Sequence, residues 1–210
     1  MEDLESSELG TKEFWEQRYD EEISNYENHG DPGEIWFGED SVERVINWML
    51  DCNISKDFKI LDLGCGNGMF LIELARNNFS KLYGADYSEN AINLAKAIAD
   101  KQDYNFINYF KHDILEKLDE KFDIIHDKGT FDAICLSENA KCNRNKYLEN
   151  ICEILNDNGY FIITSCNWTL HELDEQFLSK LIRHETIPTP QFKFGGKVGN
   201  VVTTAIYKKK

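Results

Sequence analysis

The sequence predicts an α/β fold in which a mostly parallel sheet carries helices on both faces. Strand-like apolar stretches alternate with helix-length segments between residues 59 and 165, and this alternation is typical of parallel strands joined by crossovers. In addition, one strand, Ile60 to Leu63, runs directly into a glycine loop and a helix from Met69 to Asn77. Ligands of such sheets bind at the carboxyl ends of the strands, so we expect the functional site there.

The expected elements follow one another along the chain. Residues 1–10 are expected to be disordered, and Thr11 caps a helix to about Asn28 whose aromatic positions recur every three or four residues, on one face. Later elements are a helix from Ser41 to Asp51, strands at 81–85, 105–110, 122–126 and 159–165, helices at 89–101 and 144–155, a hairpin at Gly195-Gly196 and a last strand from Asn200 to Tyr207.

The glycine loop indicates which cofactor the site takes. Alternate glycines let a ligand approach the backbone, and the following helix start presents unpaired N–H groups. A dinucleotide site requires G-x-G-x-x-G, but the third glycine here is Gly68 and position 69 is Met. The pattern, Asp62 followed by Gly64, Gly66 and Gly68, resembles motif I of the seven-stranded, Rossmann-like class I S-adenosylmethionine (SAM) methyltransferases. The resemblance implies that the glycines admit the methionine part of SAM and that Asp62 orders the loop. A purely structural turn is the alternative.

An acid ends the strand after the glycine loop. Asp86 stands 22 residues beyond Gly64, where a carboxylate can accept both ribose hydroxyls in a bidentate hydrogen bond. The alternative role is a helix N-cap, but Ser88 fills that position better. Asp113 follows the third strand, where the resembled family places an acid that accepts from the adenine amino group; a loop-capping Asp is the alternative. Tyr87, Ile114 and Asp127 complete the residues that we expect to bind the cofactor.

A longer resemblance covers nearly the whole chain from Leu9. The run Asp127-Lys-Gly-Thr-Phe-Asp-Ala133 replaces the Asn/Asp-Pro-Pro-aromatic motif of many DNA and glutamine methyltransferases. This run and the segments 9–15, 33–41, 163–169 and 188–196 resemble the eukaryotic lysine methyltransferases of translation elongation factor 1-alpha. The resemblance implies a seven-stranded sheet with one antiparallel strand, SAM as cofactor, S-adenosylhomocysteine as product, and a lysine of the basic elongation factor as substrate. The alternatives are a small-molecule methyltransferase and a non-catalytic SAM-binding partner protein, although intact acids argue against the latter.

Four residues are candidates for the substrate channel. Trp36, Phe37 and Trp168 are expected to bury the incoming lysine, since an apolar surrounding disfavours its ammonium form. A carboxylate has the opposite effect, so we assign Asp127 to binding and orienting the lysine, with proton loss through water. The alternatives are aromatic residues that belong to the core and a turn-forming Asp127. His126 is interpreted as a strand-end residue.

The charge of the chain is concentrated at one end. Residues 1–40 contain 14 Asp and Glu against Lys12 and Arg18, which gives −12 of the total net charge of −15. We therefore divide the chain into an acidic N-terminal arm and helix, 1–40, and a methyltransferase domain, 41–210. The arm disfavours nucleic acid and favours a basic partner; a merely solvated acidic segment is the alternative.

The remaining composition excludes several protein classes. No apolar run approaches the roughly 20 residues of a membrane helix, and the amino terminus is acidic where a secretory signal is basic. The six cysteines form no C-x-x-C pair, and the five histidines show no metal-ligand spacing. The sequence thus predicts a cytoplasmic monomer with reduced thiols and no bound metal.

Overall fold

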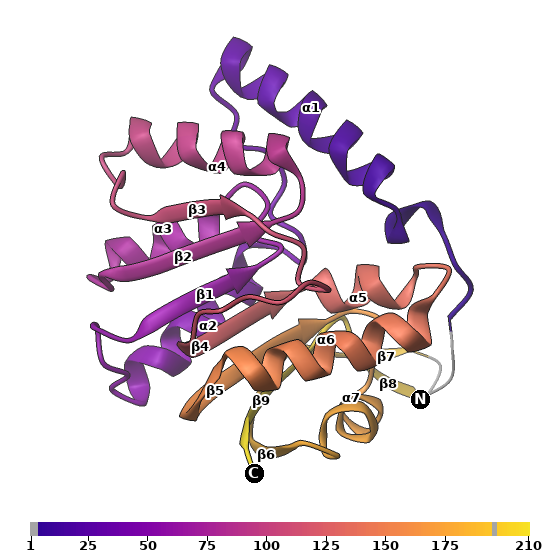
Figure 1. Cartoon of the computed structure of the whole chain (residues 1–210). Helices are drawn as coiled ribbons and strands as arrows, with labels where there is room; N and C mark the ends of the chain where they lie inside the picture. The colour runs from indigo at the N-terminus through magenta and orange to yellow at the C-terminus, as the bar shows by residue number, and fades with distance from the viewer. Residues whose placement is uncertain (1–3, 195–196) are drawn as a thin grey trace.

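The sheet has seven strands, six of them parallel. The computed structural model describes residues 4–194 and 197–210, and its strand order is β3-β2-β1-β4-β5-β9-β6 (Figure 1). The strands are β1 (Lys59–Leu63), β2 (Lys81–Asp86), β3 (Asn108–Lys111), β4 (Phe122–Lys128), β5 (Leu155–Ser165), β6 (Leu181–Ile187) and β9 (Thr203–Lys209). Only β9 runs antiparallel to its neighbours β5 and β6 within this sheet. The predicted fold, with one antiparallel strand, is confirmed.

Helices cover both faces of the sheet. One face packs on α2 (Glu39–Asp51), α3 (Met69–Arg76) and α4 (Glu89–Lys101), and the other on α5 (Thr130–Cys135), α6 (Ala140–Ile154) and α7 (Leu170–Phe177). Successive strand residues point to opposite faces, so Ile124 belongs to the first core and Ile125 to the second. Because β1 and β4 are central, their carboxyl ends meet in the middle of one sheet edge.

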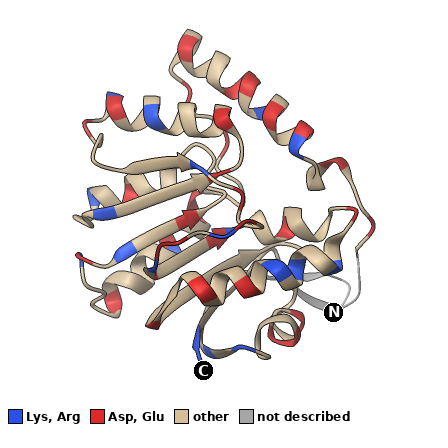
Figure 2. Cartoon of the chain, in the orientation of Figure 1, with Lys and Arg blue, Asp and Glu red and all other residues tan. Residues whose placement is uncertain are grey.

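The N-terminal segment is built onto the domain. Helix α1 (Lys12–His29) has Thr11 as its N-cap and ends at Gly30 in the left-handed conformation, as expected. It lies along α4 (Figure 1), and the Tyr26 hydroxyl donates to the Ala97 carbonyl at 3.4 Å. Most of its outward-facing charges are acidic (Figure 2).

The expected disorder of residues 1–10 is wrong for residues 4–10, and residues 1–3 lie outside the described part of the chain. A short 3-10 helix, η1 (Glu8–Gly10), precedes α1, and the Ser7 N–H donates to the Leu136 carbonyl at 3.0 Å. A Cβ on Gly10 would lie 2.2 Å from the Leu136 oxygen. Glycine is therefore required at this close approach of two backbones.

Several elements differ from the prediction. Helices α5 and α7 and strand β6 were not predicted; β6 pairs with β9 alone and exposes Ile182 to Glu185, so it lacks a clear apolar pattern. A separate antiparallel pair, β7 (Gln191–Phe194) and β8 (Lys197–Asn200), flanks the predicted hairpin turn. The turn itself, Gly195-Gly196, lies outside the described residues. Among the described residues, no helix is both long and apolar enough to span a bilayer.

Candidate active site

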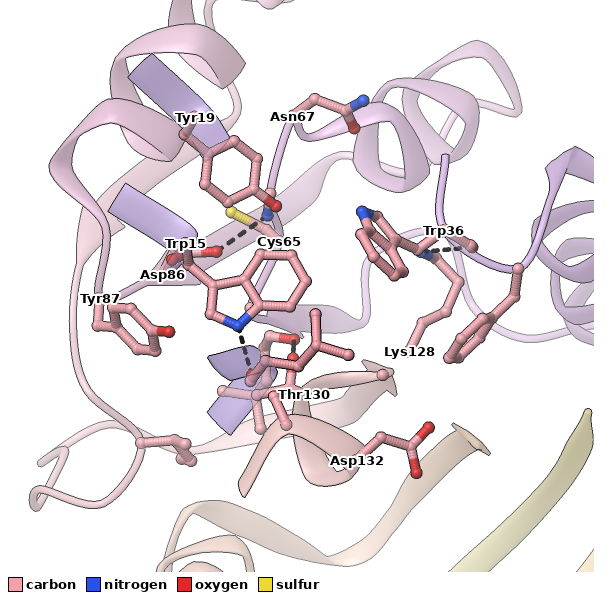
Figure 3. Close-up of a pocket in the computed structure, with 18 of the residues that line it drawn as sticks. Trp15, Tyr19, Trp36, Cys65, Asn67, Asp86, Tyr87, Lys128, Thr130 and Asp132 are labelled. Atoms are coloured by element: carbon pink, nitrogen blue, oxygen red, sulfur yellow. Dashed lines mark hydrogen bonds between the residues drawn. The ribbon is translucent and has the colours of Figure 1, made fainter. Parts of the chain in front are cut away.

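A hollow lies at the carboxyl ends of the central strands. Its floor comes from the ends of β1, β2 and β4, and its cover comes from Leu9, Trp15, Tyr19 and the segment 34–37 (Figure 3). Asp86 and Tyr87 lie at one end, and Trp36, Lys128 and Asp132 lie toward the other (Figure 3). The N-terminal segment therefore forms part of the site.

The glycine loop has the conformation that its sequence predicts. Gly64, Gly66 and Gly68 have φ values of 61°, 52° and 74°, in the left-handed region that favours glycine. A Cβ on Gly64 would lie 2.0 Å from Thr130 Oγ1, and one on Gly66 would lie 2.5 Å from the Tyr19 hydroxyl. Gly64 and Gly66 line the hollow. Gly68 instead is the N-cap of α3, and its carbonyl accepts from the Tyr109 hydroxyl at 3.1 Å.

Asp86 is buried in the wall of the hollow. Its two carboxylate oxygens accept hydrogen bonds from the N–H groups of Gly66 at 3.1 Å and Ser88 at 2.9 Å. Burial raises its pKa to about 6, although both N–H groups oppose this rise. The adjacent Tyr87 and, from the loop after β3, Ile114 also line the hollow. Three predicted cofactor residues thus come together at one end.

Asp113 lies outside this wall, between its neighbours His112 and Ile114, which line it. Its carboxylate pairs with the Lys12 ammonium at 2.6 Å and accepts from the Leu115 N–H at 3.0 Å. Burial alone would raise the pKa of Asp113, but these two donors outweigh it, and the pKa is lowered. In this structure Asp113 joins α1 to the sheet.

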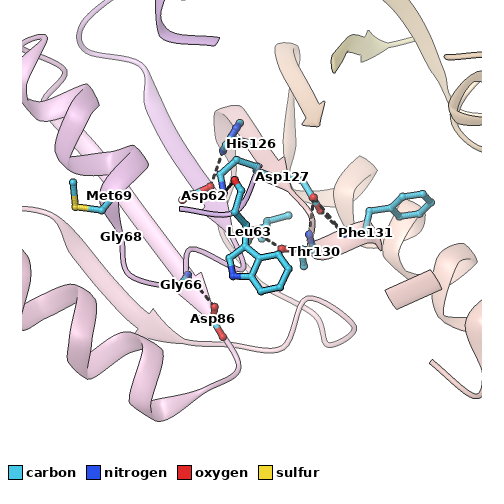
Figure 4. Close-up of polar contacts among 12 residues, drawn as sticks. Asp62, Leu63, Gly66, Gly68, Met69, Asp86, His126, Asp127, Thr130 and Phe131 are labelled. Carbon is cyan, nitrogen blue, oxygen red and sulfur yellow. Dashed lines mark hydrogen bonds and ion pairs between the residues drawn. The ribbon is translucent and has the colours of Figure 1, made fainter. Parts of the chain in front are cut away.

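Asp62 is buried behind the glycine loop. Its carboxylate contacts His126 Nδ1 at 2.7 Å (Figure 4), and the His126 ring stacks on Phe70 with 3.8 Å between ring centroids. This placement agrees with a role in ordering the loop. The pairing partner, His126, was missed because β1 and β4 are 64 residues apart and their register is not readable from the sequence.

Asp127 points away from the hollow. It is fully buried and accepts from the Thr130 and Phe131 N–H groups at 3.1 Å (Figure 4). It also accepts from the Tyr147 hydroxyl at 2.6 Å. Burial raises its pKa to about 7. The expectation that Asp127 contacts lysine and cofactor does not match this geometry, because its oxygens are engaged inside the second core.

Trp168 also lies in the second core. It is 4% exposed and does not line the hollow, so the expectation that it borders the substrate channel does not match the structure. Its neighbours Cys166 and Asn167 do line the hollow. The strand end after β5 therefore reaches the site through the two residues before the tryptophan.

Trp36 and Phe37 lie in the wall, as expected. Trp15 packs edge-on against Trp36 with 5.2 Å between centroids, and Lys128 Nζ donates to the Trp36 carbonyl at 3.0 Å. Phe37 has a φ of 66°, unusual for a residue with a side chain. The Asn67 amide, from the glycine loop, donates to the carbonyls at positions 32 and 34. The aromatic wall is thus tied to β4 and to the glycine loop.

The sequence reasoning missed several wall residues: Leu9, Trp15, Tyr19, Cys65, Asn67, Lys128, Thr130 and Asp132. The periodicity of α1 identified Trp15 and Tyr19 as an apolar face without showing what it covers. Lys128, Thr130 and Asp132 lie within the run 127–133 that carries the family resemblance, and the alternation of strand side chains could have separated the wall residues from the core residues.

Comparisons with known proteins identify the family of the chain. A family model described as a methyltransferase domain matches residues 54–208. EEF1A lysine methyltransferase 2 of Danio rerio is 46% identical over 99% of this chain and 91% of its own length. A protein-lysine N-methyltransferase of Schizosaccharomyces pombe is 38% identical, with 99% of this chain and 97% of that protein covered.

Solved structures share the fold. A magnesium protoporphyrin IX methyltransferase from Synechocystis with bound SAM superposes with a TM-score of 0.67 at 16% identity, covering 96% of this chain and 93% of that one. The sheet topology and the glycine loop beside Asp86 agree with these similarities. The chain belongs to the EEF1A lysine methyltransferase 2 family of SAM-dependent methyltransferases.

Proposed function

We propose that this protein transfers a methyl group from SAM to a lysine side chain of translation elongation factor 1-alpha. One observation carries the proposal: a single hollow joins the loop and acid end, Gly66 and Asp86, to an aromatic end with Trp36 and Phe37. The names of relatives that cover nearly the whole chain, EEF1A lysine methyltransferase 2 in Danio rerio and Homo sapiens, support the choice of substrate.

The residues at the loop end fit SAM. Gly64 and Gly66 leave bare backbone where a Cβ would clash, and Asp86 holds two oriented oxygens for the ribose hydroxyls. Tyr87 and Ile114 flank this position and are assigned to the adenine, while Asp62 orders the loop from behind. When bound, SAM supplies a methyl group on a positively charged sulfur.

The aromatic end of the hollow favours the neutral form of the substrate lysine. A free lysine has a pKa near 10.4, so only about one in a thousand is neutral at pH ~7.4, a handicap of about 4 kcal/mol. Burial against Trp36 and Phe37 disfavours the ammonium form and reduces this handicap. The neutral amine forms its bond to the methyl carbon with its own lone pair, displaces the sulfur, which keeps the bonding electrons, and then releases a proton to water.

The cellular setting follows from the substrate. Elongation factor 1-alpha works in translation, so we place the reaction in the cytoplasm, with the enzyme acting as a monomer on a folded protein. The net charge of −15 opposes nucleic acid as a direct ligand and favours a basic protein.

Mass spectrometry of purified elongation factor 1-alpha, incubated with this protein and SAM, tests the proposal. We expect one lysine to gain one or more methyl groups, and the Asp86→Ala variant to lose this activity together with SAM binding. An unmodified elongation factor in the presence of protein that binds SAM would contradict the choice of substrate. Methylation confined to low-mass compounds of an extract would favour the small-molecule alternative.

A further inference from the structure

We infer that Asp132 is the carboxylate that receives the charged amine of the substrate lysine. The inference rests on the proposed function and assigns to Asp132, on α5, a role that the sequence had suggested for Asp127. Asp132 lines the same hollow as Trp36 and Phe37, and it lies away from the Asp86 end (Figure 3).

The described hydrogen-bond partners of Asp132 are uncharged. Its carboxylate accepts from the Ser165 hydroxyl at 2.5 Å and from the Cys166 N–H at 2.9 Å, both neutral donors. Its exposed fraction is 5%, and no Lys or Arg side chain described in residues 4–190 and 201–210 forms an ion pair with it. Burial raises the pKa of Asp132, although hydrogen bonds from Ser165, Cys166 and Asn167 oppose this rise. A buried carboxylate without a cationic partner attracts an incoming cation strongly.

The other acids near the hollow are engaged elsewhere. Glu34 lines it, but its side chain is largely exposed and pairs with Arg18 at 3.2 Å. Asp86 lies at the ribose end and already orients the glycine loop. Asp127 is turned into the second core. Among the described residues, Asp132 is thus the buried acid that faces the aromatic end.

This placement suits an amine that changes its charge twice. The carboxylate first attracts the ammonium and orients its nitrogen in the hollow. After proton loss to water, the nitrogen regains positive charge as its bond to the methyl carbon forms, and the fixed carboxylate stabilises this charge. The Ser165 and Cys166 donors hold the carboxylate in place throughout.

The decisive comparison is Asp132→Asn against Ser165→Ala. The first variant removes the charge at nearly constant shape. The second keeps the charge but removes the hydrogen bond to Asp132 and the acceptor of the Asn167 and Trp168 N–H groups. We expect Asp132→Asn to raise the KM for elongation factor 1-alpha at least tenfold while the SAM Kd stays within twofold. Ser165→Ala should raise this KM less than threefold. Equal increases would mean that Asp132 only ties α5 to the strand end.

A binding cycle gives an independent readout. Replacing the modified lysine of the elongation factor by glutamine should weaken its binding to the wild-type enzyme at least tenfold, but its binding to Asp132→Asn less than threefold. Asp132→Ser supplies a second uncharged variant if Asn prevents folding, as judged by SAM binding. Equal losses in both enzymes would overturn the inference. Failure of the proposed function is distinct, since the wild type would then leave the elongation factor unmodified.

Discussion

The carboxylate of Asp86 accepts a hydrogen bond from the Gly66 N–H at 3.1 Å, which joins the end of β2 to the glycine loop after β1 (Figure 4). Its second oxygen accepts from Ser88. The group assigned to the ribose is therefore oriented before any ligand binds. Because burial raises its pKa to about 6, this group titrates close to neutral pH.

SAM binding should weaken as the pH falls through about 6. The ionised carboxylate accepts two ribose hydroxyls, whereas the protonated form must turn one oxygen into a donor. Below the pKa of Asp86 the affinity should fall about tenfold per pH unit, as measured by calorimetry from about pH 5 to pH 8. Asp86→Asn should bind at least tenfold more weakly, without this pH dependence. A flat wild-type profile would contradict the assignment.

In the ligand-free protein, the contribution of Asp86 to folding stability should depend on pH in the opposite direction from SAM affinity. The folded-state pKa of Asp86 lies above its usual value of 3.8, so the folded state binds the proton more tightly than the unfolded state does. The stabilising contribution of protonated Asp86 is complete below about 3.8 and is lost as the pH rises through about 6. Acidification should therefore separate the two quantities, with lower SAM affinity and a favourable Asp86 contribution to folding.

Asp127→Ala should destabilise the fold. The substitution leaves the Thr130 and Phe131 N–H groups and the Tyr147 hydroxyl without their acceptor. Unsatisfied buried groups cost about 1–3 kcal/mol each, and about 1 kcal/mol shifts the Tm of a chain of this size by about 2–4 °C. We expect a fall of at least about 5 °C in Tm by calorimetry. Asp127→Asn keeps an acceptor oxygen, so its Tm should lie much closer to that of the wild type.

Asp127 and Asp132 show what the sequence could and could not supply. The run 127–133 indicated a site after β4, and Lys128, Thr130 and Asp132 of this run line the hollow. It did not give side-chain direction, which depends on strand phase: Asp127 lies two residues after Ile125 and faces the same core. Asp132 reaches the hollow because α5 begins at Thr130, and this short helix had no periodic signal.

The sheet was more predictable than its cover. Apolar strands and the spacing of the glycine loop are local patterns, so the parallel core and the positions of Gly64, Gly66 and Asp86 followed from the sequence. The cover depends on long-range contacts such as the Lys12–Asp113 pair and the packing of Trp15 on Trp36. Their partners are separated along the chain, and a single sequence does not show which of them meet.

Lys128→Met should reduce catalysis but leave the affinity for SAM nearly unchanged. The substitution removes the donor that holds the Trp36 carbonyl at 3.0 Å while keeping side-chain length. The aromatic wall then loses its tie to β4, so kcat/KM for the elongation factor should fall at least tenfold, about 1.4 kcal/mol. The SAM Kd should stay within a few fold. The control is Lys121→Met, because Lys121 is exposed and directly precedes β4. An equal loss of kcat/KM in both variants would exclude a specific role of Lys128.

Gly66→Ala should abolish SAM binding. An added Cβ would lie 2.5 Å from the Tyr19 hydroxyl at a φ of 52°. In the wild type, SAM at 100 times its Kd adds about 2.7 kcal/mol of stability, whereas NAD should add none. Thermal shift assays with SAM and with NAD measure this stabilisation in the wild type and in Gly66→Ala. Gly38→Ala has a φ of 77° but open space around its Cβ, so it controls for backbone strain; a stabilisation by NAD alone would refute the cofactor assignment.

The exposed acids of α1 should steer the basic substrate toward the site. Glu13, Asp20, Glu21 and Glu27 are exposed, whereas Glu16 accepts from Ser88 and Glu22 is buried. Attraction between exposed charges is screened over about 8 Å at physiological salt. The kcat/KM for intact elongation factor should therefore fall as salt rises. Replacing the four exposed acids by their amides should reduce this salt dependence and leave kcat nearly unchanged.

A matched set of acids separates steering from net charge. Asp51, Asp103, Asp119 and Glu153 are also exposed. Asp51 ends α2 on the way to β1, and the other three precede β3, β4 and β5, so all four lie toward the sheet edge opposite the hollow. Their amide variants change the net charge equally, so only the α1 set should flatten the plot of kcat/KM against salt if position matters. Parallel plots for the α1 variant and the wild type would mean that the arm is solvated charge. Equal flattening by both sets would assign the effect to net charge alone.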